Sequence, residues 1–219
     1  MVKVERTFPA PASLAEEEKK ANGSYREPDV IERLYRDFHN KCYICEIGNL
    51  QDPQVEHLLP HQNGRYPERK FDWNNLFLSC GHCNSVKNQR KYDVGIIDCC
   101  KEDPEEQIWF RLHEKETQVS AKDGENAQAV LTAQLVTEVF NQRNTGLRTR
   151  ASAQRLHELT LEMDKFYAAL EEVTEYPESA FALRKMQVLL RRESAFAAFK
   201  RNYIREHQER YSKLFAYIA

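Results

Sequence analysis

The chain has 219 residues, a formal net charge of −2, and 41% hydrophobic, 30% charged and 11% aromatic residues, with only seven glycines and eight prolines. This composition excludes collagen-like, low-complexity and strongly disordered chains, and no stretch approaches the roughly 20 apolar residues of a membrane helix. The first residues lack the long apolar segment of a signal peptide. We therefore expect a cytoplasmic protein of one domain or two small ones, without a membrane association.

The N-terminal region, residues 1–40, predicts an arm followed by a helix. Residues 1–26 contain two early prolines and a run of charges, a pattern that allows at most a short helix. Pro28 suits a first helical turn, and apolar residues recur after it at helical spacing. We expect this helix to deliver the chain directly to Cys42.

All six cysteines lie in one window, and four of them form two Cys-x2-Cys pairs: Cys42, Cys45, Cys80 and Cys83. Disulfides are disfavoured in a reducing compartment, whereas two such turns can present four thiolates to one zinc ion. The spacing therefore predicts a structural zinc site, with a redox pair as the alternative. The adjacent Cys99 and Cys100 cannot easily share a tetrahedral site, so we interpret them as buried thiols.

A small unit of strands and a helix is predicted within residues 41–92. Residues 54–59 have the pattern of a short strand that ends at Pro60, and a polar loop then leads to the apolar run 76–78. We expect a helix over residues 84–92, because this stretch contains few helix-breaking residues. The predicted order is cysteine turn, strand, loop, strand, cysteine turn, helix.

Residues 93–149 are predicted to form an acidic extension. Between residues 93 and 140, four Lys or Arg residues stand against eleven Asp or Glu residues, a net charge of −7. We expect a strand over residues 108–112, a turn at residues 123–124 and an apolar helix over residues 127–140.

Residues 150–219 are expected to be mostly helical. Apolar residues three and four apart from Leu156 to Val173 define one stripe. Pro177 interrupts this stripe and is expected to open a second helix. The simplest interpretation is an intramolecular helical hairpin, and a heptad surface for another chain is the alternative.

Four polar residues in this frame have the chemistry of a hydrolytic site. Glu56 and His57 lie on the first predicted strand, Asn75 precedes the second cysteine pair, and Asn84 directly follows it. Carboxylate and amide oxygens suit Mg²⁺ or Mn²⁺, and histidine can take a proton from water at neutral pH. Adjacent strand residues point to opposite sides, so Glu56 and His57 cannot converge unless the strand end bends.

Residues 41–92 resemble HNH endonucleases, which have a zinc-stapled ββα-metal fold. The resemblance is carried by the two cysteine pairs together with Glu56, His57, Asn75, Asn84 and Lys87. It implies that His57 is the general base, that Glu56 and Asn84 bind a catalytic Mg²⁺ or Mn²⁺, and that the four cysteines bind structural Zn²⁺. It also implies that Asn75 holds the loop that orients His57, and that a kink brings Glu56 and His57 to one site. Many members have aspartate where this chain has Glu56, which leaves the preferred metal open.

A wider resemblance links residues 25–150 to HNH proteins encoded in bacterial antiphage systems. These include the nuclease partner of an ABC-type ATPase in Septu systems and in some retrons. The resemblance rests on segments around the same motifs and on residues 98–106. It implies an assembly with an ATPase partner, for which residues 150–219 are a candidate docking surface.

Basic residues gather beside the predicted metal site. Residues 60–92 contain six Lys or Arg residues and two acidic residues, a net charge of +4. Such cations can neutralise backbone phosphates without reading sequence, although any one of them could instead lie on a solvated loop or helix face. The candidate nucleic-acid contacts are Arg65, Arg69, Lys70, Lys87, Arg90 and Lys91, with His61 as a further candidate for phosphate or metal.

The sequence thus predicts an α+β protein in which a small zinc-stapled HNH core is embedded in a mostly α-helical chain. We expect a metal-dependent endonuclease, acting on DNA more readily than on RNA, as the effector of an antiphage complex. The alternatives are a non-catalytic zinc-binding module that docks nucleic acid or protein, and a stand-alone restriction-type nuclease. Glu56, His57, Asn75 and Asn84 together discriminate against the first alternative, because a purely structural zinc site does not require them.

Overall fold

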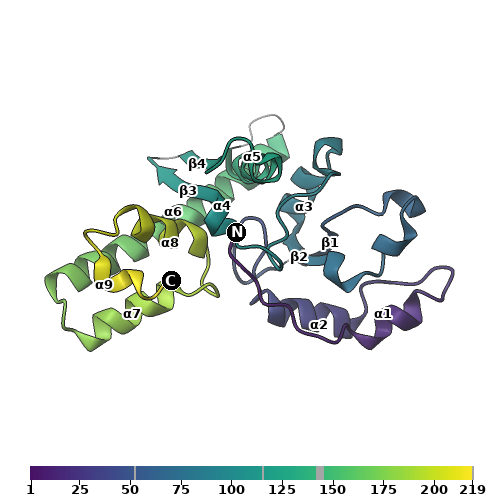
Figure 1. Ribbon diagram of the computed structural model, residues 1–219, viewed down its shortest axis with the longest axis horizontal. Coiled ribbons are helices and arrows are strands. Elements are labelled where there is room, and N and C mark those ends of the chain that lie inside the picture. The colour runs from purple at the N-terminus through teal and green to yellow at the C-terminus, as the bar shows by residue number, and fades with distance from the viewer. Residues whose placement is uncertain (52, 115, 142–145, 219) are drawn as a thin grey trace.

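The computed structural model describes residues 1–51, 53–114, 116–141 and 146–218. Over these residues the chain is a mixed α+β structure, in which two small antiparallel sheets lie among helices (Figure 1). This architecture agrees with the expected fold class.

The N-terminal segment packs into the body of the protein. It contains the short helix α1 (Ala12–Glu17), and the expected longer helix follows as α2 (Pro28–Asp37). Met1 and Val4 are buried, and the Val4 N–H donates to the carbonyl oxygen of Cys99 (2.9 Å). The segment that the sequence predicts as an arm is therefore part of the core.

A hairpin and a helix follow the first cysteine turn. Strand β1 (Pro53–His57) pairs antiparallel with β2 (Leu76–Cys80), and α3 (Gly81–Lys87) begins directly after β2. The Cys80 sulfur accepts a hydrogen bond from the Cys83 N–H (3.4 Å), which caps the helix at that point. The connection between the strands contains three 3₁₀ turns, Gln62–Gly64, Pro67–Arg69 and Trp73–Asn75.

The predicted bounds of the helix over residues 84–92 are wrong at both ends, because the helix spans Gly81–Lys87. It begins earlier because of the Cys80 cap, and it ends at Lys87, after which Asn88 and Gln89 leave the helical conformation. The Gln89 side chain donates to the Val86 carbonyl oxygen (2.6 Å) and so satisfies one of the open carbonyls at the helix end. Residues Arg90–Tyr92 form a separate 3₁₀ turn.

A second sheet lies in the acidic extension. Strand β3 (Ile108–His113) follows the short helix α4 (Pro104–Gln107) and pairs antiparallel with β4 (Glu116–Ala121), and α5 (Ala127–Asn141) packs against β4. Strand β3 and helix α5 confirm the expected elements, whereas β4 was not predicted. In β4, Thr117, Val119 and Ala121 alternate with more exposed residues, but Val119 and Ala121 are only partly buried, so the apolar alternation of the strand is short and weak.

The C-terminal region is helical, as expected, with α6 (Gly146–Glu175), α7 (Ala180–Leu190), α8 (Ala197–Glu206) and α9 (Ser212–Phe215). Pro177 lies in the break between α6 and α7, but it does not open α7. Ser179 does so, because its Oγ accepts a hydrogen bond from the Ala182 N–H (3.3 Å). The apolar stripe of α6 is buried and α7 packs against α6, as an intramolecular hairpin requires.

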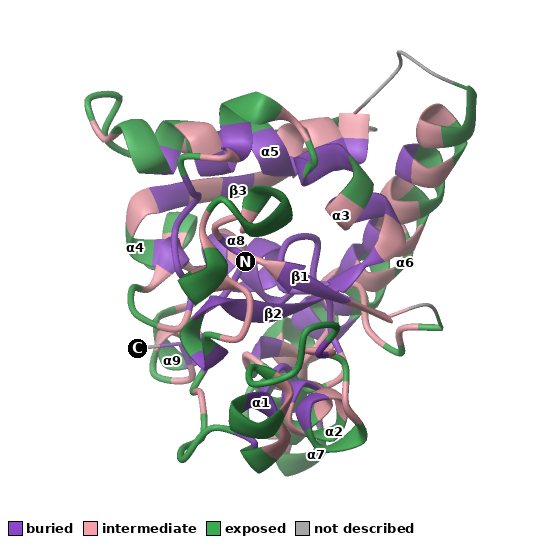
Figure 2. Ribbon diagram, turned by 90° about the vertical axis from the view of Figure 1, so that its right-hand side faces the viewer, coloured by how far each residue is buried: buried purple, intermediate pink, exposed green. Residues whose placement is uncertain are grey.

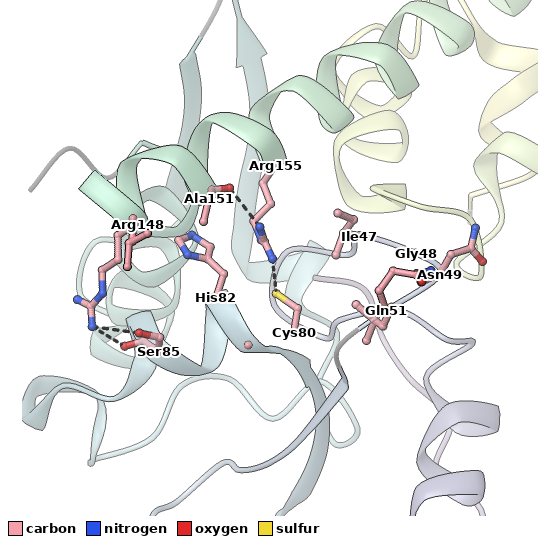
Figure 3. Close-up of a pocket in the computed structure, with 13 residues that line it drawn as sticks. Ile47, Gly48, Asn49, Gln51, Cys80, His82, Ser85, Arg148, Ala151 and Arg155 are labelled. Carbon is pink, nitrogen blue, oxygen red and sulfur yellow. Dashed lines mark hydrogen bonds between the residues drawn. The ribbon is translucent and has the colours of Figure 1, made fainter. Parts of the chain in front are cut away.

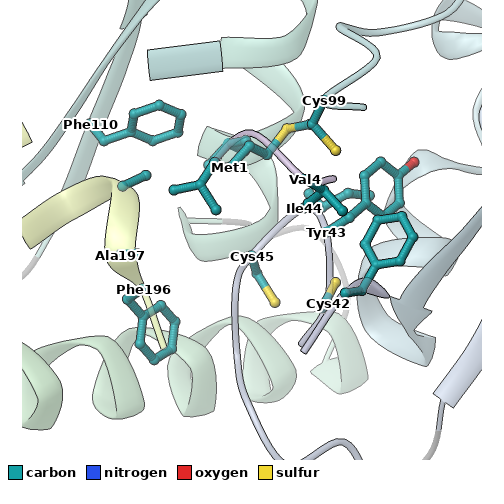
Figure 4. Packing of buried hydrophobic residues seen from close by; sticks show 14 of the residues in the cluster. Met1, Val4, Cys42, Tyr43, Ile44, Cys45, Cys99, Phe110, Phe196 and Ala197 are labelled. Carbon is teal, nitrogen blue, oxygen red and sulfur yellow. The ribbon is translucent and has the colours of Figure 1, made fainter. Parts of the chain in front are cut away.

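One cluster of buried hydrophobic residues connects all of these elements. In Figure 4, Met1 and Val4 lie beside Ile44 of the first cysteine turn, and Ala197 of α8 and Phe110 of β3 approach from another side. Strand β2 is buried along its whole length (Figure 2). The cysteine turns are therefore held from several parts of the chain.

The elements are arranged around this core from one side of the molecule to the other. In Figure 1, β1, α1 and α2 lie on the right, α7, α8 and α9 lie on the left, the second sheet lies above α8, and α5 lies at the top near the centre. Among the described residues, no helix combines the length and the apolar character that a membrane span requires.

Candidate functional site

Four cysteine thiols form a compact buried cluster. Cys42 and Cys45 come from the turn before β1, Cys80 and Cys83 come from the β2–α3 junction, and their sulfur atoms all lie within 4.8 Å of one another. The Cys45 and Cys80 sulfurs are 4.0 Å apart. Four thiolates at about 2.3 Å from one zinc ion would stand roughly 3.8 Å from each other. Among the described His, Cys, Asp and Glu residues, this is the group that could hold a metal ion, and its chemistry fits zinc.

A cation from the C-terminal region contacts this cluster. Arg155 on α6 donates through Nη2 to the Cys80 sulfur (3.2 Å), as Figure 3 shows. Hydrogen bonds with the three other thiols lower the pKa of Cys80, and the Arg155 charge adds to this effect. Burial raises the pKa of Cys45 and Cys83. The thiolate is the form of cysteine that binds zinc, so the Arg155 contact favours the binding form at Cys80.

A cavity of about 500 Å³ lies beside the cysteine cluster. Ile47 and Leu50 of the cysteine turn line it, together with His82 of α3 and Arg148 of α6 (Figure 3). Of the residues that the sequence predicts for the site, Cys80 lines this cavity and the expected catalytic residues do not.

A second cavity, of about 350 Å³, lies at the end of β1. It brings together four residues that the sequence predicts for the reaction site, namely Glu56, His57, His61 and Asn84. Lys87 also lines it, and the remaining wall comes from Pro60, Gln62, Asn63, Asn88 and Asp93. We call this cavity the β1 pocket.

His57 lies in the β1 pocket as a neutral imidazole. Its Nε2 lies 3.0 Å from the Lys70 carbonyl oxygen. Because a carbonyl oxygen can only accept, Nε2 carries the hydrogen and Nδ1 carries the free lone pair. Burial lowers the pKa of His57 to about 4, so the ring is uncharged at neutral pH. Among the described residues, none makes a hydrogen bond with Nδ1, which leaves this nitrogen available to accept a proton.

Glu56 is a buried carboxylate with two hydrogen-bond partners. Its side chain is 6% exposed, Oε1 accepts from the Lys87 ammonium (2.6 Å), and Oε2 accepts from the Tyr43 hydroxyl (2.5 Å). Burial raises the pKa of Glu56, and the Lys87 charge opposes that shift. Lys87 is also one of the predicted nucleic-acid contacts. Its side chain is buried, lines the β1 pocket and is paired with Glu56.

Lys87 also explains how Glu56 and His57 reach one pocket. Besides Glu56, its ammonium donates to the backbone carbonyl oxygens of His57 and Leu58, each at 3.0 Å. Consecutive carbonyls of a regular strand point in opposite directions, so the chain turns where both reach the same ammonium. A bend of the kind that the resemblance implies therefore lies at the end of β1, and Lys87 of α3 provides the group that holds it.

Asn75 is buried and binds the backbone of the loop that follows β1. Its Oδ1 accepts from the Leu59 N–H (2.8 Å), and its Nδ2 donates to the carbonyl oxygens of Leu59 and Arg69, each at 2.9 Å. The residue after Arg69 is Lys70, whose carbonyl oxygen accepts from His57. The contacts of Asn75 thus join the two ends of the loop that follows His57.

The other expected nucleic-acid contacts differ in whether their side chains are exposed or make contacts within the protein. Arg65 and Arg90 are exposed. Arg69 lies over the Tyr66 ring, Lys70 donates to the Gly23 carbonyl oxygen (2.9 Å), and Lys91 pairs with Glu138. Part of the predicted basic face is therefore used for internal contacts.

His61 stands beside His57 in the β1 pocket. The two ring centroids are 5.0 Å apart, and burial lowers the pKa of His61. Its Nδ1 is buried without a hydrogen-bond partner among the described residues. This arrangement is compatible with the expected contact to a metal or a phosphate.

Comparisons with known proteins give one partial match. No family model matches the chain. The chain is similar to the Septu protein PtuB of Bacillus thuringiensis, with 32% identity over an alignment of 89 residues that covers 36% of this chain and 34% of that protein. The match thus spans about a third of the length of that relative and supports a Septu-like relationship.

Replacing Cys80 with serine tests the zinc assignment. The variant should lose zinc and about 3 kcal/mol or more of its free energy of unfolding, because structural zinc contributes directly to folding. Elemental analysis gives the metal content, and urea unfolding gives the stability. Cys100→Ser changes a half-buried thiol outside the cluster and should retain zinc. A Cys80→Ser chain as stable and as zinc-loaded as this control would contradict the assignment.

Proposed function

We propose that this chain is a metal-dependent endonuclease of the HNH type that hydrolyses phosphodiester bonds, with DNA as its substrate. One observation carries the proposal, namely that Glu56, His57 and Asn84 line a single pocket. Lys87 holds the backbone at His57 and Leu58, and Asn75 holds the loop that follows. A structural zinc module would not need this arrangement of acid, base and amide.

The donor atoms in the β1 pocket fit Mg²⁺ or Mn²⁺. Each Glu56 oxygen accepts one hydrogen bond, and a carboxylate has about four acceptor positions in all, so lone pairs remain. Asn84 adds an amide oxygen, and oxygen donors of this kind suit hard divalent cations. Glu56 and Asn84 would hold the ion. When bound, it would supply positive charge to stabilise the phosphate oxygens during the reaction.

His57 is the proposed general base. Its Nδ1 accepts a proton from a water molecule while the water oxygen bonds to phosphorus and the bond between phosphorus and the 3′-oxygen breaks. The departing 3′-oxygen takes a proton from a solvent water molecule, and the His57 imidazolium then returns its proton to solvent, so that the products are a 5′-phosphate and a 3′-hydroxyl. The Lys70 carbonyl keeps the ring oriented through Nε2–H, and it stabilises the imidazolium that forms.

The similarity to Septu protein PtuB supports a role in antiphage defence. We propose that the chain is the effector of such a system and acts with an ABC-type ATPase. The helices of residues 150–219 are the proposed docking surface, because the proposed chemistry does not require them. Cytoplasmic location follows from this role.

One observation favours a non-catalytic zinc-binding module as the second candidate. Both oxygens of Glu56 are already hydrogen-bonded, which is the state expected of a purely structural buried carboxylate. Such a module would bind nucleic acid or protein without divalent-dependent cleavage. A stand-alone restriction-type nuclease would instead cut specific sequences without a partner.

Replacing His57 with alanine separates these candidates. We expect the wild-type chain to nick supercoiled DNA with Mg²⁺ or Mn²⁺, and His57→Ala to lower the rate by about 100-fold or more, because general-base catalysis typically contributes that much. His113→Ala removes an exposed histidine outside the pocket and should cleave normally. Zinc content should be the same in all three proteins. Full activity of His57→Ala would refute the base assignment, and an inactive wild-type chain would favour the second candidate.

Co-expression with the product of the neighbouring gene tests the defence role. The proposal expects that product to be an ABC-type ATPase that co-elutes with this chain and makes cleavage depend on ATP. Size-exclusion chromatography followed by nicking assays with and without ATP measures both effects. An adjacent ATPase that fails to bind would remove the proposed assembly while leaving the nuclease chemistry untouched.

A further inference from the structure

A segment of the N-terminal region, residues 17–26, forms a tightly determined turn beside the β1 pocket. The Ser24 N–H donates to the Glu17 carboxylate (2.9 Å). A Cβ atom at Gly23 would stand 1.8 Å from the Glu17 carbonyl oxygen, so only glycine fits there. The turn therefore has one well-defined path, and the positions of the residues after it are fixed.

Lys70 joins this turn to the proposed general base. Its ammonium donates to the Gly23 carbonyl oxygen (2.9 Å), and its own backbone carbonyl accepts from His57 Nε2 (3.0 Å). The N-terminal turn and the His57 ring are thus bound to the same residue. A displacement of the turn would move the group that orients the base.

Tyr25 lies directly against the proposed general base. Its ring meets the His57 ring edge-on, with centroids 4.6 Å apart and planes at 74°, and the His61 ring is 6.4 Å away. The Tyr25 ring therefore covers part of His57, and it restricts the directions in which the imidazole can turn.

Arg26 extends this contact to the surface. Its Nη2 donates to the Tyr25 hydroxyl (3.1 Å), and its Cζ lies 5.1 Å from the centre of the Tyr25 ring. The side chain is exposed and has no acidic partner among the described residues. An exposed, unneutralised guanidinium beside a proposed phosphodiesterase pocket is suited to bind a backbone phosphate.

We propose that the N-terminal turn is part of the nuclease site, with Tyr25 as a positioning residue for His57 and Arg26 as a contact to a phosphate of the bound strand. The inference rests on the proposed function and extends the site beyond residues 41–92. It assigns the substrate contact to a residue that belongs to neither the cysteine turns nor the basic loop.

The Arg26 contact is tested by binding, without any cleavage. Fluorescence anisotropy with a labelled DNA duplex in EDTA, over a series of salt concentrations, gives the dissociation constant and its salt slope. Arg26→Gln should weaken binding several-fold and reduce the log–log slope by about 0.9, because one phosphate contact is lost.

The matched control is Arg210→Gln. Arg210 is also exposed and lies over its neighbouring Tyr211 ring at 5.3 Å, next to α9 on the opposite side of the molecule (Figure 1). Its removal should leave the slope unchanged. Equal slopes for Arg26→Gln and the wild type would overturn the contact, even if the protein nicks DNA normally. A wild-type chain that does not bind DNA would overturn the contact and the proposed function together.

The Tyr25 role is tested by separating kcat from KM in the nicking assay. Tyr25→Leu removes the ring from His57 and should lower kcat about tenfold with little change in KM, since a misplaced base lowers the rate of the chemical step. Tyr25→Phe keeps the ring and should retain kcat. Arg26→Gln should instead raise KM. Circular dichroism and zinc content confirm that each variant is folded. A kcat of Tyr25→Leu equal to that of the wild type would contradict the positioning role. So would a kcat of Tyr25→Phe as low as that of Tyr25→Leu.

Discussion

The ammonium group of Lys87 bonds to three oxygens at the end of β1, and the rest of the reaction site depends on this contact. It pairs with the Glu56 carboxylate and with the carbonyls of His57 and Leu58. Lys87 lies one helical turn after Cys83, so the cysteine cluster sets the position of α3, and α3 sets the bend that places Glu56 and His57 in one pocket. The proposed structural zinc site and the proposed catalytic site therefore lie at opposite ends of the short helix α3.

This use of Lys87 changes how the charge of the region is understood. Residues 60–92 have a net charge of +4, but Lys87, Lys70 and Lys91 all make internal contacts. The positive charge available to a nucleic acid is consequently smaller than the residue count suggests, and Arg65, Arg90 and Arg26 become its main exposed contributors. Buried Lys87 organises the site, and the exposed arginines are the cations that remain for the proposed substrate.

Local patterns in the sequence predicted many of the helices and strands and several residues of the candidate site. The paired cysteines, helix α2 and strand β1 each depend on spacing within a few residues, and the structure has them where expected. The missed features depend on distant partners. Tyr25 and Arg155 reach the two sites from separate parts of the chain, and the buried pair of Glu105 with Arg201 spans 96 positions. Strand β4 has only a short alternation of Thr117, Val119 and Ala121, and it is stabilised by pairing with β3 and by packing against α5.

The proposed chemistry requires the β1 pocket to bind a divalent cation through Glu56 and Asn84. Anomalous scattering from crystals soaked in MnCl₂, measured at the manganese and zinc absorption edges, shows whether it does. We expect a manganese peak in contact with both side chains and a zinc peak among the four cysteines, which serves as the internal control. A zinc peak at the cysteines without any manganese peak in the β1 pocket would contradict the proposed chemistry.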